Sequence, residues 1–115
     1  MANHRRFKRQ YIIAEAKIRT LKKDNLWINA MLINISKGGI GLYLKKSLKT
    51  GEKVAVKIAF LRNDKIRIVE EMPGIIKWAR QIGNNYAAGI MFDEAINKKT
   101  TPRLWNCLEY ARHDK

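Results

Sequence analysis

Apolar and polar residues alternate with a period of two along most of the chain, which predicts β-strands with one buried face. The run Val54, Val56, Ile58 and Phe60 shows the pattern most clearly. Six further strands are expected at Tyr11 to Arg19, Trp27 to Ile35, Ile40 to Leu44, Ile66 to Val69, Gly74 to Ala79 and Tyr86 to Phe92. No helical segment separates them, which favours an antiparallel sheet closed into a small barrel and argues against a parallel βαβ fold.

Two of these strands carry additional expectations. In the run Trp27 to Ile35, apolar residues occupy both alternating sets of positions, so we expect a central strand covered on both faces. Pro73 and Gly74 predict a break or a bulge within a long strand of two parts.

The periodicity changes to that of a helix only at the C-terminal end. Leu104, Leu108 and Ala111 repeat at helical spacing, behind Thr101 as the expected N-cap and Pro102 at the first helical position. We therefore predict one short helix over about residues 102–112, with Trp105 and Tyr110 packing it onto the barrel.

Net charge adds a class of partner to this picture. The 115 residues include 24 Lys and Arg and 10 Asp and Glu, which gives a formal net charge of +14. A single domain with this excess favours a polyanionic partner, such as nucleic acid, an anionic membrane surface or a small phosphorylated ligand.

Compartment and catalysis can also be addressed from composition. The lone Cys107 excludes a disulfide framework within the chain, and no stretch approaches the roughly 18 apolar residues of a membrane span, so we expect a cytoplasmic protein. His4 and His113 lie at opposite ends, and no hydrolase, metalloprotease or phosphate-loop motif occurs. We therefore expect no enzymatic activity, no catalytic residue and no metal site.

Two segments carry candidate binding chemistry. Arg5 and Arg9 are separated by three residues before the first strand, and a guanidinium group matches phosphate oxygens or the O6 and N7 acceptors of guanine. The segment Asn34-Ile35-Ser36-Lys37-Gly38-Gly39 lies between two strands, with short polar side chains and glycines that allow close backbone approach. Each alone also fits a plainer interpretation, namely a solvated basic tail and an ordinary β-turn.

Together and in this order, the two segments resemble the PilZ domain family of bacterial cyclic di-GMP receptors. Arg5 and Arg9 match the RxxxR motif of that family, while Asn34, Ser36 and Gly39 match its [D/N]xSxxG motif. The runs Gly74 to Trp78 and Gly89 to Phe92 resemble its GxVxW and GxxF strands, so the likeness covers nearly the whole chain. Asn34 departs from the commoner Asp, which keeps an acceptor oxygen but loses the charge.

The resemblance implies a six-stranded antiparallel PilZ-type β-barrel with a short C-terminal α-helix. It implies a flexible ligand-binding segment over residues 1–10 and a single barrel domain over residues 11–115. The ligand would be cyclic di-GMP, and ordering of the N-terminal segment would signal to a downstream protein partner that the sequence does not identify. The ligand-binding residues implied are Arg5, Arg6, Arg9, Asn34, Ser36, Gly38 and Gly39, with Arg6 adding mainly charge.

Two alternatives stay open from the sequence. A basic β-barrel that binds nucleic acid without sequence preference would use the charge of +14 for backbone contacts, although few aromatic residues line a basic strand. A PilZ-like domain that serves only as a protein adaptor would bind no nucleotide. A dianionic ligand does not need so large a charge, which keeps the nucleic-acid alternative in view.

Overall fold

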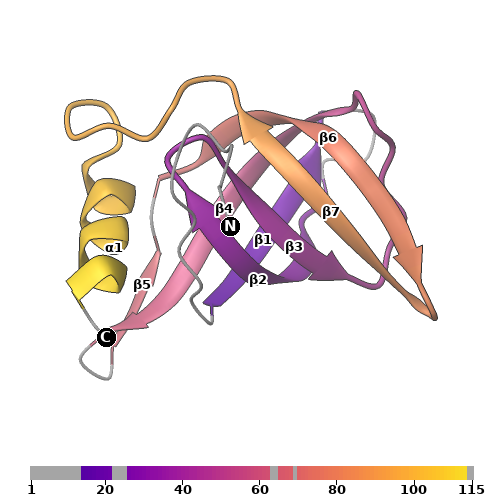
Figure 1. Cartoon of the computed structure of the whole chain (residues 1–115), viewed down its shortest axis with the longest axis horizontal. Coiled ribbons are helices and arrows are strands. Elements are labelled where there is room, and N and C mark those ends of the chain that lie inside the picture. Colours follow the sequence, from indigo (N-terminus) through magenta and orange to yellow (C-terminus); the bar gives the residue numbers. More distant parts are fainter. Residues whose placement is uncertain (1–13, 22–25, 63–64, 69, 114–115) are drawn as a thin grey trace, which may run out of the picture.

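The computed structural model describes residues 14–21, 26–62, 65–68 and 70–113, shown in Figure 1. These residues form β1 (Ala14–Thr20), β2 (Ile28–Ser36), β3 (Gly39–Leu44), β4 (Lys53–Arg62), β5 (Lys65–Ile68), β6 (Met72–Ile82), β7 (Asn85–Phe92) and α1 (Pro102–His113). The alternating pattern therefore predicted the strands, and the helical spacing predicted α1 to within one residue. Tyr11 to Ile13, the start of the first expected strand, lie outside the described residues.

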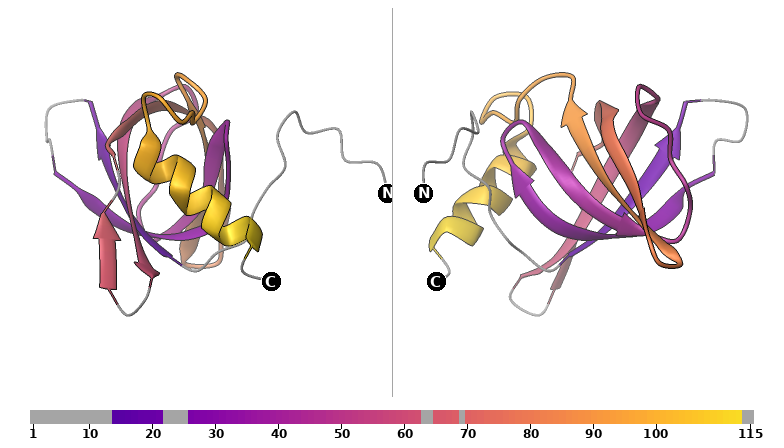
Figure 2. Two further views of the ribbon diagram at one scale, coloured as in Figure 1. Left: turned by 90° about the vertical axis from the view of Figure 1, so that its left-hand side faces the viewer. Right: turned by 45° about the vertical axis from the view of Figure 1, so that its right-hand side comes forward.

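Six strands close into a barrel. The ring runs β1-β2-β3-β7-β6-β4, and the pairing of β4 with β1 completes it, every pairing being antiparallel. β5 pairs with the distal part of β4, Ala59 to Arg62, and so extends a hairpin from the ring. The expected six-stranded antiparallel barrel is confirmed, and Figure 2 shows α1 lying across one end of it.

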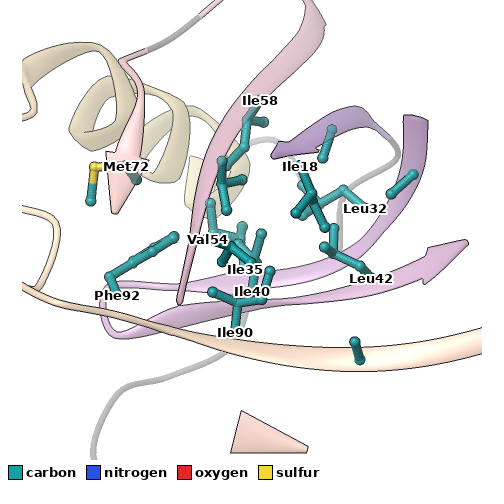
Figure 3. Close-up of a cluster of buried hydrophobic side chains, with 14 of the residues drawn as sticks. Ile18, Leu32, Ile35, Ile40, Leu42, Val54, Ile58, Met72, Ile90 and Phe92 are labelled. Atoms are coloured by element: carbon teal, nitrogen blue, oxygen red, sulfur yellow. The ribbon is translucent and has the colours of Figure 1, made fainter. Parts of the chain in front are cut away.

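The inward-facing residues of the ring form one aliphatic core, part of which is drawn in Figure 3. Each strand contributes alternate residues, and α1 adds Leu104 and Leu108, four positions apart on one helix face. Burying a side chain such as that of Leu104 stabilises the packed helix by roughly 1.5 to 3 kcal/mol. The largest fully buried side chains are Ile18, Leu32, Ile35, Ile40, Leu42, Val54, Val56, Ile58, Ile76 and Leu104.

The expectation that β2 is covered on both faces was wrong. Met31 is 58% exposed and Ile33 is 38% exposed, whereas Leu32 between them is buried. A closed barrel has a single interior, so each strand turns one face to solvent unless another element covers it. α1 covers an end of the barrel, and the apolar side chains on the outer face of β2 stay exposed.

The expected break or bulge at Pro73 and Gly74 was wrong, because both residues lie within β6 and pair in continuous register with Ala55 and Val54 of β4. The bulge lies further along, between Ile76 and Trp78, where Lys77 is an extra residue relative to β7. A second bulge interrupts β2 between Leu32 and Asn34. Both bulges bear on the candidate site.

The start of α1 differs from the expectation in one respect. Thr101 does precede the first helical residue, and its carbonyl accepts the first helical bond from the N–H of Trp105 at 2.9 Å. Its hydroxyl, however, accepts from the N–H of Asn97 at 2.8 Å and donates to the Asn97 carbonyl at 2.9 Å. The Thr101 side chain therefore closes the preceding loop and does not cap the helix.

Glu70, in the connector before β6, caps α1 instead. Its two carboxylate oxygens accept hydrogen bonds from the backbone N–H groups of Arg103 and Leu104, each at 3.0 Å. A carboxylate at a helix N-terminus satisfies donors that have no partner within the helix and interacts favourably with the helix dipole. Among the described residues, no helix has the length and apolar character that crossing a membrane requires.

Candidate functional site

The polar motif predicted between two strands forms a tight turn. Ser36 ends β2, Gly39 begins β3, and Lys37 and Gly38 connect them. The Ser36 hydroxyl accepts a hydrogen bond from the N–H of Gly38 at 3.3 Å and donates to the Gly39 carbonyl at 3.4 Å. Since Ser36 is only 7% exposed, its side chain shapes the turn from within.

The backbone of this turn is fixed to the end of β7 and to the loop that follows. The carbonyl of Gly38 accepts a hydrogen bond from the N–H of Phe92 at 2.9 Å. The carbonyl of Lys37 accepts one from the N–H of Ile96 at 2.7 Å. The turn is thus a rigid feature at the edge of the outer barrel face.

Asn34 lies on that outer face, beside the turn. The bulge at Ile33 shifts the register of β2, so that Asn34 pairs with Gly41 of β3. A Cβ atom placed on Gly41 would lie 3.0 Å from Nδ2 and 3.1 Å from Oδ1 of Asn34. The amide of Asn34 therefore lies over Gly41, in space that the absence of a side chain leaves open.

The same cross-strand row continues over the next two strands. Gly41 pairs with Gly89 of β7, and Gly89 pairs with Trp78 of β6. A Cβ atom on Gly89 would fall 2.1 Å from Nε1 of Trp78, so the indole ring lies directly on Gly89. Asn34 and Trp78, each beside a bulge, thus lie at the two ends of a cross-strand row, and Gly41 and Gly89 lie between them.

We call these four residues the glycine floor. Three spacings between neighbouring strands separate its ends, or about 14 Å of sheet. Met91 stands on one side of the floor, in the row that also holds Gly39, and Tyr43 stands on the other, in the row that ends with Arg80. The floor is therefore a flat strip with one exposed aromatic end, since Trp78 is 43% exposed.

The electrostatic character of this face favours an anion. The strands β2, β3, β6 and β7 contain Lys77 and Arg80 and no Asp or Glu. The guanidinium carbon of Arg80 lies 5.9 Å from the centre of the Trp78 ring. A flat surface with hydrogen-bonding groups at one end, an indole at the other and positive charge beside it suits a ligand with planar rings and phosphates.

The structure therefore brings four of the predicted residues, Asn34, Ser36, Gly38 and Gly39, to a single turn and its flanking strands. The other three, Arg5, Arg6 and Arg9, lie outside the described residues. Among the described residues, no three His, Cys, Asp or Glu side chains gather closely enough to hold a metal ion.

Sequence reasoning missed the other members of the glycine floor. Trp78 and Gly89 each lie in a strand that resembles a family motif, yet only the register of β6 against β7 shows that the ring lies on the glycine. Gly41 carries no motif at all. A register prediction that placed the bulge at Lys77 would have been needed to find this row.

Comparison with known proteins gives one family. The model of the PilZ domain family matches residues 3–109 of the chain. No curated protein sequence gives a significant match.

Several solved structures share the fold. The Bacillus subtilis inhibitor of motility MotI/DgrA superposes with a TM-score of 0.75 at 17% identity, over 98% of this chain and 52% of that one, so this chain spans about half its length. The PilZ domain of YcgR from Escherichia coli, solved with c-di-GMP, gives a TM-score of 0.64 at 16% identity, over 98% and 99% of the two chains. The PilZ domain of CeSA from a cellulose-synthesizing bacterium gives 0.52 at 16% identity, over 89% and 98%.

Proposed function

The chain belongs to the PilZ domain family, and from this premise we propose that it is a receptor for cyclic di-GMP and not an enzyme. The observation that carries the proposal is the glycine floor beside the motif turn, on a barrel face without acidic residues. Support also comes from YcgR, whose PilZ domain shares this fold and was solved with c-di-GMP. The proposal implies that the protein works in the bacterial cytoplasm, where it meets the ligand.

We assign recognition of a guanine edge to the motif turn. The Asn34 amide offers both donors and an acceptor, and the Ser36 turn fixes the backbone of Gly38 and Gly39 beside it. Trp78 offers the only aromatic surface on the glycine floor, where a purine can pack against an apolar ring. This division places hydrogen-bond specificity at one end of the floor and apolar contact at the other.

We assign the phosphates and the second guanine edge to Arg5 and Arg9, with Arg6 adding charge. The direction of β1 supports this assignment. Ala14 pairs with Leu32 in an antiparallel register, so β1 begins at the side of the barrel toward which β2 continues to Asn34 and Ser36.

The lengths are compatible with this geometry. Arg9 precedes Ala14 by five residues, which span at most roughly 17 Å. Ser36 lies four residues beyond Leu32, about 13 Å along the strand. Residues 1–10 would then act as a ligand-binding segment that becomes ordered on the ligand, and the ordered surface would be what a downstream protein partner recognises.

Calorimetric titration with cyclic di-GMP tests the proposal. We expect the wild-type protein to bind, and Arg5→Ala and Arg9→Ala each to abolish measurable binding, because forked contacts to phosphate or guanine are lost. Arg6→Ala is expected to weaken binding less. Lys17→Ala, which removes one positive charge from the exposed face of β1, is the control and should bind as the wild type does. Wild-type affinity in both Arg5→Ala and Arg9→Ala would contradict the assignment.

A nucleic-acid function is the second candidate, because a charge of +14 exceeds what a dianion requires. One further observation favours it. Trp27 is flanked by the guanidinium of Arg19 at 5.1 Å and the ammonium of Lys57 at 4.5 Å, which combines an aromatic ring with basic groups on β1 and β4. Affinity for oligonucleotides that falls steeply with salt and exceeds that for cyclic di-GMP would favour this candidate.

A further inference from the structure

The motif turn contacts α1 as well as β7. The ammonium group of Lys37 lies 4.4 Å from the centre of the Trp105 ring, a distance at which a cation and an aromatic face attract each other. Trp105 is half-buried against the core, and the neighbouring Leu104 is fully buried. One side chain of the turn is therefore held by a residue that is itself anchored to the barrel.

The anchoring of Trp105 depends on how α1 is docked. The Leu104 side chain packs one face of the helix into the core. The Glu70 carboxylate holds the first helical turn by accepting hydrogen bonds from the N–H groups of Arg103 and Leu104. The loop before the helix adds a second connection, since the N–H of Ile96 donates to the Lys37 carbonyl at 2.7 Å. Lys37 is thus connected to α1 through its side chain and to the loop before α1 through its backbone.

We propose that Trp105 is a positioning residue for the ligand-binding turn, and that ligand occupancy and docking of α1 are therefore coupled. This inference rests on the proposed cyclic di-GMP site and extends it to the helix. Trp105 would not touch the ligand; it would hold Lys37, and with it the backbone of the turn that carries Ser36 and Gly38.

Coupling of this kind is reciprocal. A helix that is loosened from the barrel lowers the affinity of the turn for the ligand, and a bound ligand tightens the helix by the same factor. A half-exposed cation–π contact has a modest energy, so removing it should weaken ligand binding by about two- to fivefold. The same factor should appear as slower hydrogen exchange in α1 when the ligand is present.

The test compares three variants with a matched control. Trp105→Leu removes the ring and keeps an apolar side chain, Lys37→Met removes the ammonium group, and Lys37→Arg keeps a cation over the ring. Trp27→Leu is the control, because it removes a contact of the same kind, with Lys57 at 4.5 Å, at the opposite end of β2 from the turn. Cyclic di-GMP affinity is measured by calorimetry, thermal stability by circular dichroism, and docking of α1 by hydrogen exchange.

We expect Trp105→Leu and Lys37→Met to weaken cyclic di-GMP binding by similar factors. Lys37→Arg and Trp27→Leu should leave the affinity unchanged. In the wild type, the ligand should slow exchange of the helix amides beyond Leu104, and Trp105→Leu should reduce this protection at a temperature where both proteins are folded.

Other outcomes separate the inference from the proposed function. If the wild type binds cyclic di-GMP and its helix amides exchange at an unchanged rate, the coupling is wrong while the receptor function stands. Loss of affinity in Lys37→Met but not in Trp105→Leu would make Lys37 a direct ligand contact and overturn the positioning role. If Trp27→Leu weakens binding as much as Trp105→Leu does, the effect is general destabilisation and the inference fails. Absence of binding in the wild type rejects the receptor function together with the coupling.

Discussion

Glu70 accepts a hydrogen bond of 3.0 Å from the backbone N–H of Leu104, although the two residues are 34 positions apart in the chain. This bond joins the connector before β6 to the first turn of α1. It holds the helix against the barrel at Leu104, whose side chain is fully buried.

Removal of this cap should destabilise the protein. Glu70→Ala leaves two backbone N–H groups without their carboxylate partner, so we expect the free energy of unfolding to fall by about 1 to 2 kcal/mol. Urea unfolding measures the change. Glu71→Ala is the matched control: Glu71 makes an ion pair of 3.1 Å with Arg19 near the surface, and its loss should cost less than about 1 kcal/mol. Equal losses in both variants would show that Glu70 contributes only charge.

Gly39 is required by the packing of β3 on β7. A Cβ atom there would lie 2.1 Å from the carbonyl oxygen of Ile90, and backbone atoms cannot move aside without separating the strands. We expect Gly39→Ala to lower the free energy of unfolding by about 2 to 3 kcal/mol in urea titrations.

Gly41→Ala provides the comparison. The three atoms nearest to the added methyl group would all belong to the Asn34 side chain, at 3.0 to 3.3 Å, and a side chain can shift more easily than backbone. This variant should keep nearly all its stability and lose ligand affinity. A Gly39→Ala protein as stable as the wild type would mean that the approach of β3 and β7 is looser than these distances indicate.

Gly89→Ala tests the glycine floor itself. The new methyl group occupies the position of the Trp78 ring, which can swing into solvent because Trp78 is 43% exposed. Stability should fall by about 1 kcal/mol or less, while affinity for cyclic di-GMP should fall because the floor is filled and the ring displaced. In a Trp78→Ala background, Gly89→Ala should have almost no effect on stability, since the clash is gone. A full stability loss in that background would place the clash elsewhere.

Ser36→Ala tests how much the shape of the turn contributes to ligand affinity, apart from the contribution of the arginine charges. The variant loses the acceptor for the Gly38 N–H and the donor to the Gly39 carbonyl, so we expect about 1 kcal/mol of destabilisation. Calorimetry should show weakened cyclic di-GMP binding, though less than in Arg9→Ala. Ser47→Ala, at an exposed position after β3, should change neither quantity. Binding abolished in Ser36→Ala would mean that the hydroxyl contacts the ligand directly.

The alternating pattern predicted the strands because each inward position, such as Val54 or Ile58, must be apolar for a one-sided core. The same reasoning failed for Met31 and Ile33, since composition alone does not say whether a second layer covers an outer face. Motif spacing located Asn34 and Ser36 because they are close in sequence and both lie at the end of β2, next to one turn. The pairing of Trp78 with Gly89 depends on a bulge, and the cap by Glu70 depends on the closed topology, so neither could be inferred locally.

The closure of the barrel has a consequence for how the protein unfolds. β1 pairs with β2 and with β4, and its pairing with β4 closes the ring, so the barrel stays closed only while β1 keeps both neighbours. Arg5 and Arg9 precede this strand in the sequence. In the proposed complex, a ligand bound by these arginines and by the motif turn would connect the chain before β1 to the end of β2, and it would therefore slow the opening of the native barrel.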